Sequence, residues 1–130
     1  MTFPADTSVP GVPRLEPEIL DDRRSADSWE RDLRVPKDLS CWPGHFPDYA
    51  IVPGVVQLAW IMRLLREYTG RVPKLQSLEA VKFKTPLLPL QQLTLTLRPG
   101  KDPSRFDFKL ADGTTVFSEG RIVLLEKAAG

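Results

Sequence analysis

From residue 29 onward, apolar and polar residues alternate in short runs, which is typical of strands that bury one face. In the first run, over residues 29–35, Trp29, Leu33 and Val35 alternate with charged residues, and Pro36 ends the pattern. The second half of the chain carries four more runs, which predict strands over residues 75–83, 93–98, 105–110 and 114–125. Strands in such quick succession favour an antiparallel sheet.

Turn signals separate the later runs. Pro99-Gly100 predicts a turn, and Asp112-Gly113 is a strong signal for a two-residue hairpin. Gly120 falls inside the last run, where a glycine predicts a bulge or the close approach of another backbone.

A helix is predicted over residues 53–69. Pro53 suits the first helical position, and Gly70 suits a left-handed cap after the last turn. The side chains from Val55 to Leu65 are apolar on nearly every face, as expected of a helix buried inside a larger structure. The pattern therefore predicts an α+β domain in which an antiparallel β-sheet wraps around one long buried helix.

The chain before the first strand has a different character. Residues 1–26 contain four prolines and scattered charges without a sustained period, so we expect an extended arm or disordered tail there. A short helical turn is expected over residues 16–20. We assign residues 27–126 to a single domain and residues 127–130 to a frayed tail, with a loop over residues 37–52 ahead of the helix.

Composition excludes several classes of function. The 18 Lys and Arg residues nearly balance the 17 Asp and Glu residues, so nucleic acid is not an expected partner. One cysteine, Cys41, allows no internal disulfide, and no Cys/His cluster predicts a metal site. No apolar stretch is long enough to span a membrane and no signal pattern opens the sequence, so we expect a cytoplasmic protein.

The candidate for chemistry is His45, the only histidine. A lone histidine is more often structural than catalytic. His45, however, lies in a loop that leads directly into the N-terminus of the predicted buried helix, where free N–H groups and the helix dipole favour developing negative charge. A base beside such a site is what proton abstraction next to a thioester carbonyl requires.

Two motifs in this region resemble those of a known family. The segment Gly44-His45-Phe46-Pro47-Asp48-Tyr49-Ala50-Ile51-Val52-Pro53-Gly54-Val55-Val56-Gln57-Leu58 resembles the GHFPxxPxxPGVxQ signature of the FabA/FabZ-type β-hydroxyacyl-acyl carrier protein dehydratases. Its second half, followed by Trp60, is closer to the ApeI-like aryl-polyene dehydratases. The segment Val81-Lys82-Phe83-Lys84-Thr85-Pro86-Leu87-Leu88-Pro89 is similar to the family's KFxxPVxPGD segment.

This resemblance implies a hot-dog fold and an enzyme that needs no cofactor. It implies a dimer with two acyl tunnels at the subunit interface, whose substrate is a (3R)-hydroxyacyl chain on the phosphopantetheine of acyl carrier protein in fatty acid or aryl-polyene biosynthesis. His45 matches the base that removes the α-proton. The N–H of Gly54 matches the donor to the thioester carbonyl, with Val55 beside it. Six further residues are candidates for lining the substrate tunnel, namely Phe46, Tyr49, Pro53, Gln57, Ala59 and Trp60. The alternative for Gln57 and Trp60 is structural packing, and for Tyr49 it is anchoring of the loop.

One departure from the family pattern affects the chemistry. The family's helix carries a carboxylate that protonates the departing hydroxyl in the facing subunit, and that position is Ala59 here. Neither Asp48, on the histidine loop, nor Glu79, on a strand, is a good replacement. Two hypotheses follow: a dehydratase-like homodimer, or a catalytically impaired homologue that serves as partner subunit or acyl-binding module. A heterodimer with a carboxylate-bearing partner would combine them, while a thioesterase would need a carboxylate that the helix lacks.

Overall fold

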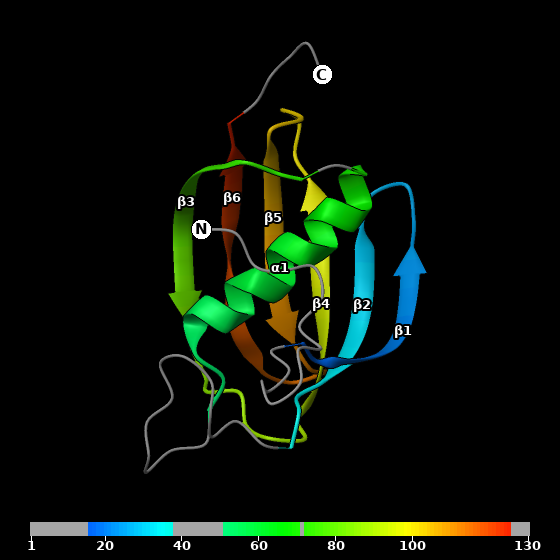
Figure 1. Ribbon diagram of the computed structural model, residues 1–130, viewed down its shortest axis with the longest axis vertical. Helices are drawn as coiled ribbons and strands as arrows, with labels where there is room; N and C mark the ends of the chain where they lie inside the picture. Colours follow the sequence, from blue (N-terminus) through cyan, green and yellow to red (C-terminus); the bar gives the residue numbers. More distant parts are fainter. Residues whose placement is uncertain (1–15, 38–50, 71, 126–130) are drawn as a thin grey trace, which may run out of the picture.

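The computed structural model describes residues 16–37, 51–70 and 72–125. In these residues six strands form one antiparallel sheet in the order β1-β2-β4-β5-β6-β3, and one helix, α1, lies diagonally across one face (Figure 1). The elements are β1 (Glu18–Arg24), β2 (Trp29–Arg34), α1 (Gly54–Thr69), β3 (Leu75–Phe83), β4 (Gln92–Pro99), β5 (Arg105–Ala111) and β6 (Val116–Leu124). The predicted α+β hot-dog architecture is confirmed.

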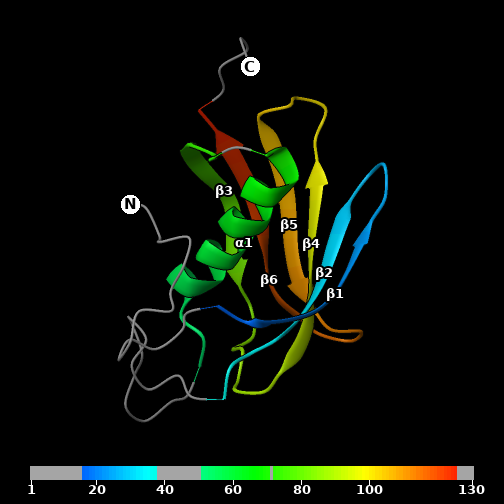
Figure 2. The ribbon, with the colours of Figure 1, turned by 45° about the vertical axis from the view of Figure 1, so that its right-hand side comes forward.

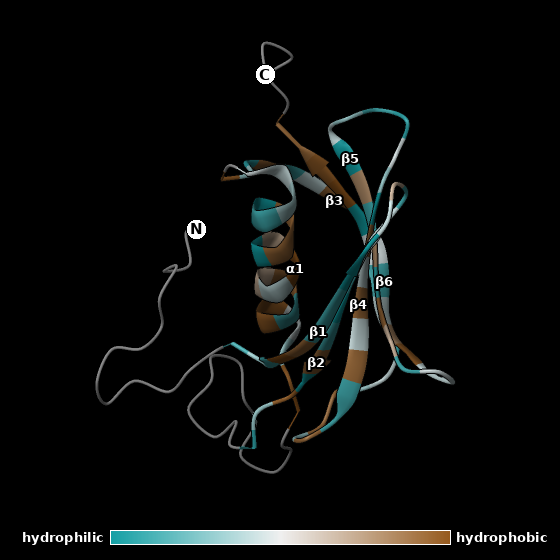
Figure 3. Ribbon diagram, turned by 90° about the vertical axis from the view of Figure 1, so that its right-hand side faces the viewer, coloured by the Kyte–Doolittle hydropathy of each residue, from teal (hydrophilic) through white to brown (hydrophobic). Residues whose placement is uncertain are grey.

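The core lies between the sheet and α1. Alternate side chains of β4 and β5 face the helix and are buried, and the register brings Leu95 opposite Leu110 and Leu97 opposite Phe108. Turned views show the helix on one side of a twisted sheet, so the described fold has two layers (Figures 2 and 3). The period-two pattern predicted these strands because each buries one face.

The helix begins one residue later than predicted. Pro53 has the φ angle of a helix, −62°, but its ψ angle of 150° is extended, so Pro53 is the N-cap and Gly54 is the first helical residue. Gly70 ends the helix with a φ angle of 78° and donates its N–H to the carbonyl of Arg66. The sheet covers only one face of α1, whose buried residues are Val56, Gln57, Trp60, Ile61, Leu64 and Leu65.

Residues 18–24 form a strand, so the helical turn predicted over residues 16–20 is wrong. Strand β1 pairs with β2, and ion pairs strengthen the contact: Arg31 on β2 binds Asp22 on β1 at 2.7 Å and Glu67 on α1 at 2.7 Å. The sheet therefore begins before the predicted domain boundary at residue 27. The expectations for residues 1–15 and 127–130 lie outside the described residues.

Gly120 sits at a close approach, as predicted. Glu79 of β3 pairs with Arg121 and Lys82 pairs with Glu119, so two residues of β3 bulge opposite Gly120. A Cβ atom on Gly120 would lie 2.8 Å from Cγ2 of Val81, which leaves room for glycine alone. The hairpin at Asp112-Gly113 is also present, although strands end at 111 and resume at 116, so its connection is longer than two residues.

Candidate functional site

The N-terminus of α1 offers two backbone donors. Pro53 has no N–H, and its carbonyl accepts the N–H groups of Val56 at 3.0 Å and Gln57 at 3.1 Å. The N–H groups of Gly54 and Val55 have no hydrogen-bond acceptor among the described residues. The first turn carries no acidic side chain that would neutralise the positive end of the helix dipole. The arrangement suits an oxygen atom that develops negative charge.

Phe83 lies against this helix terminus. It is the last residue of β3, and a Cβ atom on Gly54 would lie 2.9 Å from its Cζ atom. Half of the Phe83 surface remains exposed, so the ring forms an open apolar wall beside the two donors. Phe83 was not among the residues predicted for the site, although it belongs to the second family motif.

Gln57 is buried between α1 and β6. Its amide nitrogen donates to the carbonyl of Val52 at 3.2 Å, and its amide oxygen accepts the hydroxyl of Ser118 at 2.9 Å. The tunnel role expected for Gln57 remains untested, but both ends of its amide are already engaged within the protein. Ser118, 61 residues away in the chain, was not singled out from the sequence.

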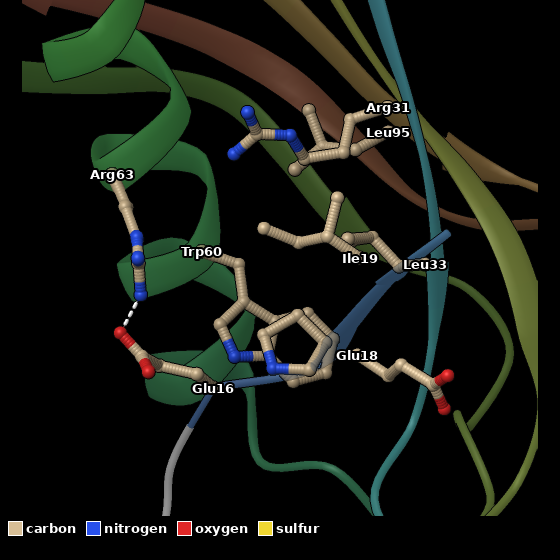
Figure 4. Close-up of a pocket in the computed structure, with 9 residues that line it drawn as sticks. Glu16, Glu18, Ile19, Arg31, Leu33, Trp60, Arg63 and Leu95 are labelled. Atoms are coloured by element: carbon tan, nitrogen blue, oxygen red, sulfur yellow. Dashed lines mark ion pairs between the residues drawn. The ribbon is translucent and has the colours of Figure 1, made fainter. Parts of the chain in front are cut away.

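Trp60 lines a cavity that Ala59 does not line. Trp60 is buried and lines a cavity of about 270 Å³ between α1 and strands β1, β2 and β4, and Ala59 is not part of its lining (Figure 4). Arg31 and Arg63 also line this cavity, and Arg63 forms an ion pair with Glu16 there. Ala59 is instead half-buried, one helical turn after Val55, whose side chain is 44% exposed.

No carboxylate on α1 is placed to act as an acid near the two donors. Glu67, the acidic residue of α1, belongs to the distant end of the helix, where hydrogen bonds from Arg31 hold its pKa below the ordinary value. Glu79 on β3 forms ion pairs with Arg105 at 3.1 Å and Arg121 at 3.8 Å. Ala59 therefore leaves the described helix without the family's acid.

The predicted site also includes residues of the loop before α1. His45, Phe46 and Tyr49 lie outside the described residues, and their roles stay predictions. Within the described ranges, no group of three His, Cys, Asp or Glu side chains is arranged to hold a metal ion. In the same part of the chain, no helix is long and apolar enough to cross a membrane.

Comparison with known proteins decides the family. The pattern of the ApeI-like family, described as ApeI dehydratase, matches residues 21–121. The chain belongs to the ApeI-like dehydratases. This ApeI-like chain is also 32% identical over 98 residues to the 3-hydroxyacyl-[acyl-carrier-protein] dehydratase FabZ of Streptococcus suis, covering 67% of the chain and 69% of that relative. The family predicted from the two motifs is confirmed.

Solved structures agree with this assignment. The ApeI-like chain resembles a chain of the dehydratase heterocomplex ApeI:P from Xenorhabdus doucetiae with a TM-score of 0.75 and 26% identity, covering 85% of this chain and 99% of that one. It also resembles an uncharacterised protein from Erwinia carotovora subsp. atroseptica with a TM-score of 0.69 and 29% identity, covering 87% and 98% of the two chains.

Proposed function

We propose that this protein is a (3R)-hydroxyacyl-[acyl-carrier-protein] dehydratase subunit of fatty acid or aryl-polyene biosynthesis in the cytoplasm. The observation that carries the proposal is the pair of N–H groups at Gly54 and Val55, which have no acceptor among the described residues. They belong to the same motif as His45 and follow it closely in the chain. A base and an oxyanion site joined by one short segment suit α-proton abstraction from a thioester.

The proposed reaction has two parts. His45 removes the α-proton, and the resulting negative charge on the carbonyl oxygen is stabilised by the Gly54 N–H. The electron pair then forms the α,β double bond as the β-hydroxyl leaves. An acid protonates that hydroxyl so that it departs as water, and such assistance is worth roughly 10²–10⁴ in rate. With Ala59 on α1, the acid comes from elsewhere.

A partner subunit is the proposed source of the acid. Several apolar side chains along β3 and the start of α1 are exposed, and one structural relative is part of a heterocomplex. These residues are Val55 (44% exposed), Leu75 (47%), Leu78 (38%) and Phe83 (50%), and we call them the β3 face. Exposed apolar side chains along an edge strand favour a subunit interface. A homodimer would carry Ala59 twice, whereas a heterodimer partner with a carboxylate at the matching position would complete the site.

The second candidate function is a catalytically impaired subunit that binds the acyl chain or supports an active partner. Ala59 favours it, because a subunit without its own acid can still fold, associate and bind a thioester. In this case His45 and the Gly54 N–H would be retained without supporting turnover.

Installing the acid tests the two functions against each other. We would follow enoyl-thioester absorbance with (3R)-hydroxyacyl substrates on acyl carrier protein, comparing the parent, Ala59→Asp, Ala59→Glu and each combined with His45→Ala. Under the dehydratase proposal the parent is slow, a carboxylate raises the rate by roughly 10²-fold, and His45→Ala abolishes it. Intact dimers with no activity in any variant would support the impaired subunit. A fast parent that neither carboxylate changes would place the acid elsewhere in this chain.

A further inference from the structure

A buried row of hydrogen bonds leads to the start of α1. The N–H of Val52 donates to the carbonyl of Leu87 at 2.9 Å, and the Val52 carbonyl accepts the Gln57 amide nitrogen at 3.2 Å. The Gln57 amide oxygen then accepts the Ser118 hydroxyl at 2.9 Å. Val52 and Gln57 are each 3% exposed and Ser118 is fully buried, so water does not compete for these bonds.

The chemistry of the groups allows one arrangement. A backbone carbonyl can only accept, so the NH₂ side of the Gln57 amide must face Val52. The Gln57 oxygen is thereby turned toward Ser118, whose hydroxyl must donate. Reversing the amide would place two acceptors together at Val52, which is costly in a buried site. The Val52 carbonyl therefore determines which way the Gln57 amide is turned, and the Ser118 hydroxyl holds the amide oxygen in place, so that Gln57 in turn restrains the Val52 carbonyl.

The orientation of the Val52 carbonyl restrains the Gly54 and Val55 N–H groups. The Val52 carbonyl belongs to the planar peptide that joins Val52 to Pro53, and the ring of Pro53 fixes the next φ angle. Only the ψ angle of Pro53 then separates that peptide from the one that carries the Gly54 N–H. The backbone N–H of Gln57 also donates to the Pro53 carbonyl at 3.1 Å, which restrains that remaining angle.

We propose that Gln57 and Ser118 are positioning residues that aim the Gly54 and Val55 N–H groups at the thioester carbonyl. The proposal rests on the proposed function for its substrate. Neither residue touches that substrate, because their polar atoms are buried and engaged with each other and with Val52. Their effect is to keep the donors in the geometry that the negatively charged oxygen needs, without reorganisation during the reaction.

Two variants break the row in different places. Ser118→Ala removes the buried donor that holds the Gln57 amide oxygen and so loosens the side chain that binds Val52, while Gln57→Glu places a carboxylate oxygen against the Val52 carbonyl. Ser118→Thr keeps the hydroxyl and is the conservative rescue. Thr94→Val is the matched control, since it removes a hydroxyl that donates to Asp32 at 2.7 Å on the sheet between β4 and β2.

The direct readout is the infrared carbonyl stretch of a bound thioester. We would use ¹³C-carbonyl hexanoyl-pantetheine, which has no hydroxyl to lose, with the full chain and its folding checked by circular dichroism. In the parent and Thr94→Val the hydrogen-bonded carbonyl should shift to lower frequency. Ser118→Ala and Gln57→Glu should lose most of that shift, and Ser118→Thr should keep it. The kcat for dehydration should fall on the order of tenfold in the two disrupting variants with KM changed less than twofold, a smaller loss than the roughly 100-fold for deleting an oxyanion donor.

The outcomes separate this inference from the proposed function. An unshifted carbonyl in the parent, a shift that survives both disrupting variants, or an equal loss in Thr94→Val would each overturn the positioning role. A parent that shows the shift, with the shift lost only in the disrupting variants, but no turnover in the parent, Ala59→Asp or Ala59→Glu, would overturn the dehydratase proposal and support the positioning role. If Gln57→Glu fails to fold, Ser118→Ala carries the test, because it removes a single buried atom.

Discussion

The ring of Phe83 lies over Gly54, so that a Cβ atom at position 54 would come within 2.9 Å of Cζ and 3.1 Å of Cε2. Phe83 ends β3 and Gly54 begins α1, and the contact therefore joins the edge of the sheet to the helix terminus that bears the two free donors. The two N–H donors at the start of α1 therefore lie next to the β3 face, to which Phe83 belongs.

Gly54→Ala should displace the Phe83 ring. The ring is half exposed and can move outward, so we expect a loss in the free energy of unfolding at the low end of the range for overpacking, about 1 kcal/mol. Urea denaturation measures this loss. In a Phe83→Ala background, Gly54→Ala should lower the free energy of unfolding by much less. An equal loss in both backgrounds would show that the new methyl group does not clash with the Phe83 ring.

Gly120→Ala should be more damaging than Gly113→Ala. At Gly120 the new Cβ atom would lie 2.9 Å from the backbone Cα of Val81, which cannot move without disturbing the β3–β6 pairing, so we expect a loss of roughly 2–3 kcal/mol in the free energy of unfolding. At Gly113 no atom lies within 4 Å of the new Cβ. Equal denaturation midpoints for the two variants would contradict the close approach at Gly120.

Low pH should destabilise the fold by protonating the carboxylates that form ion pairs around β2. Hydrogen bonds from Arg31 hold the pKa of Glu67 below its ordinary value of 4.5, and those from Arg23 hold the pKa of Asp32 below 3.8. A carboxyl whose pKa is lower in the folded protein stabilises the fold above its ordinary pKa, and this stabilisation disappears as pH falls through the folded value. The free energy of unfolding, measured in urea at stepped pH, should therefore decline below pH 4.5. Glu67→Gln should make that decline less steep. An unchanged slope would show that Glu67 does not contribute to the pH dependence of the free energy of unfolding.

The β3 face should control association. Leu75→Glu places a charge on an exposed apolar edge and should shift the protein toward monomer in sedimentation experiments at micromolar concentration. Ile19→Glu is a matched control, because Ile19 is 45% exposed and Leu75 is 47% exposed, but Ile19 lies on β1 at the opposite edge (Figure 1). A parent that is already monomeric, or a control that dissociates equally, would contradict an interface at this face.

Local patterns in the sequence were sufficient for most of the fold. Strands such as β4 and β5 bury one face, so their period of two is visible in the residues themselves. The helix was predicted from its caps and apolar content. Its start was placed one residue early because Pro53 satisfies the helical φ angle while its ψ angle remains extended.

Features that depend on a pairing partner and leave no periodic pattern in their own residues were not predicted. Strand β1 has only exposed side chains, so no alternation marks it, and it forms because β2 supplies both backbone partners and ions of opposite charge. The hydrogen bond between Ser118 and Gln57 was not predicted for the same reason, since no local pattern at either residue points to a partner 61 residues away. The free donors at Gly54 were anticipated because the missing partners at a helix terminus are a local property.

The two edges of the sheet differ in polarity, and this difference limits how many subunits can associate through the sheet. At one edge, β3 exposes Leu75, Leu78 and Phe83. At the other, five of the seven side chains of β1 are charged. A sheet with two apolar edges could add copies at both ends and extend into a filament, whereas a charged outer strand repels a further strand. Two copies joined through β3 would therefore leave a charged β1 at each outer end, and such an assembly would be complete with two subunits.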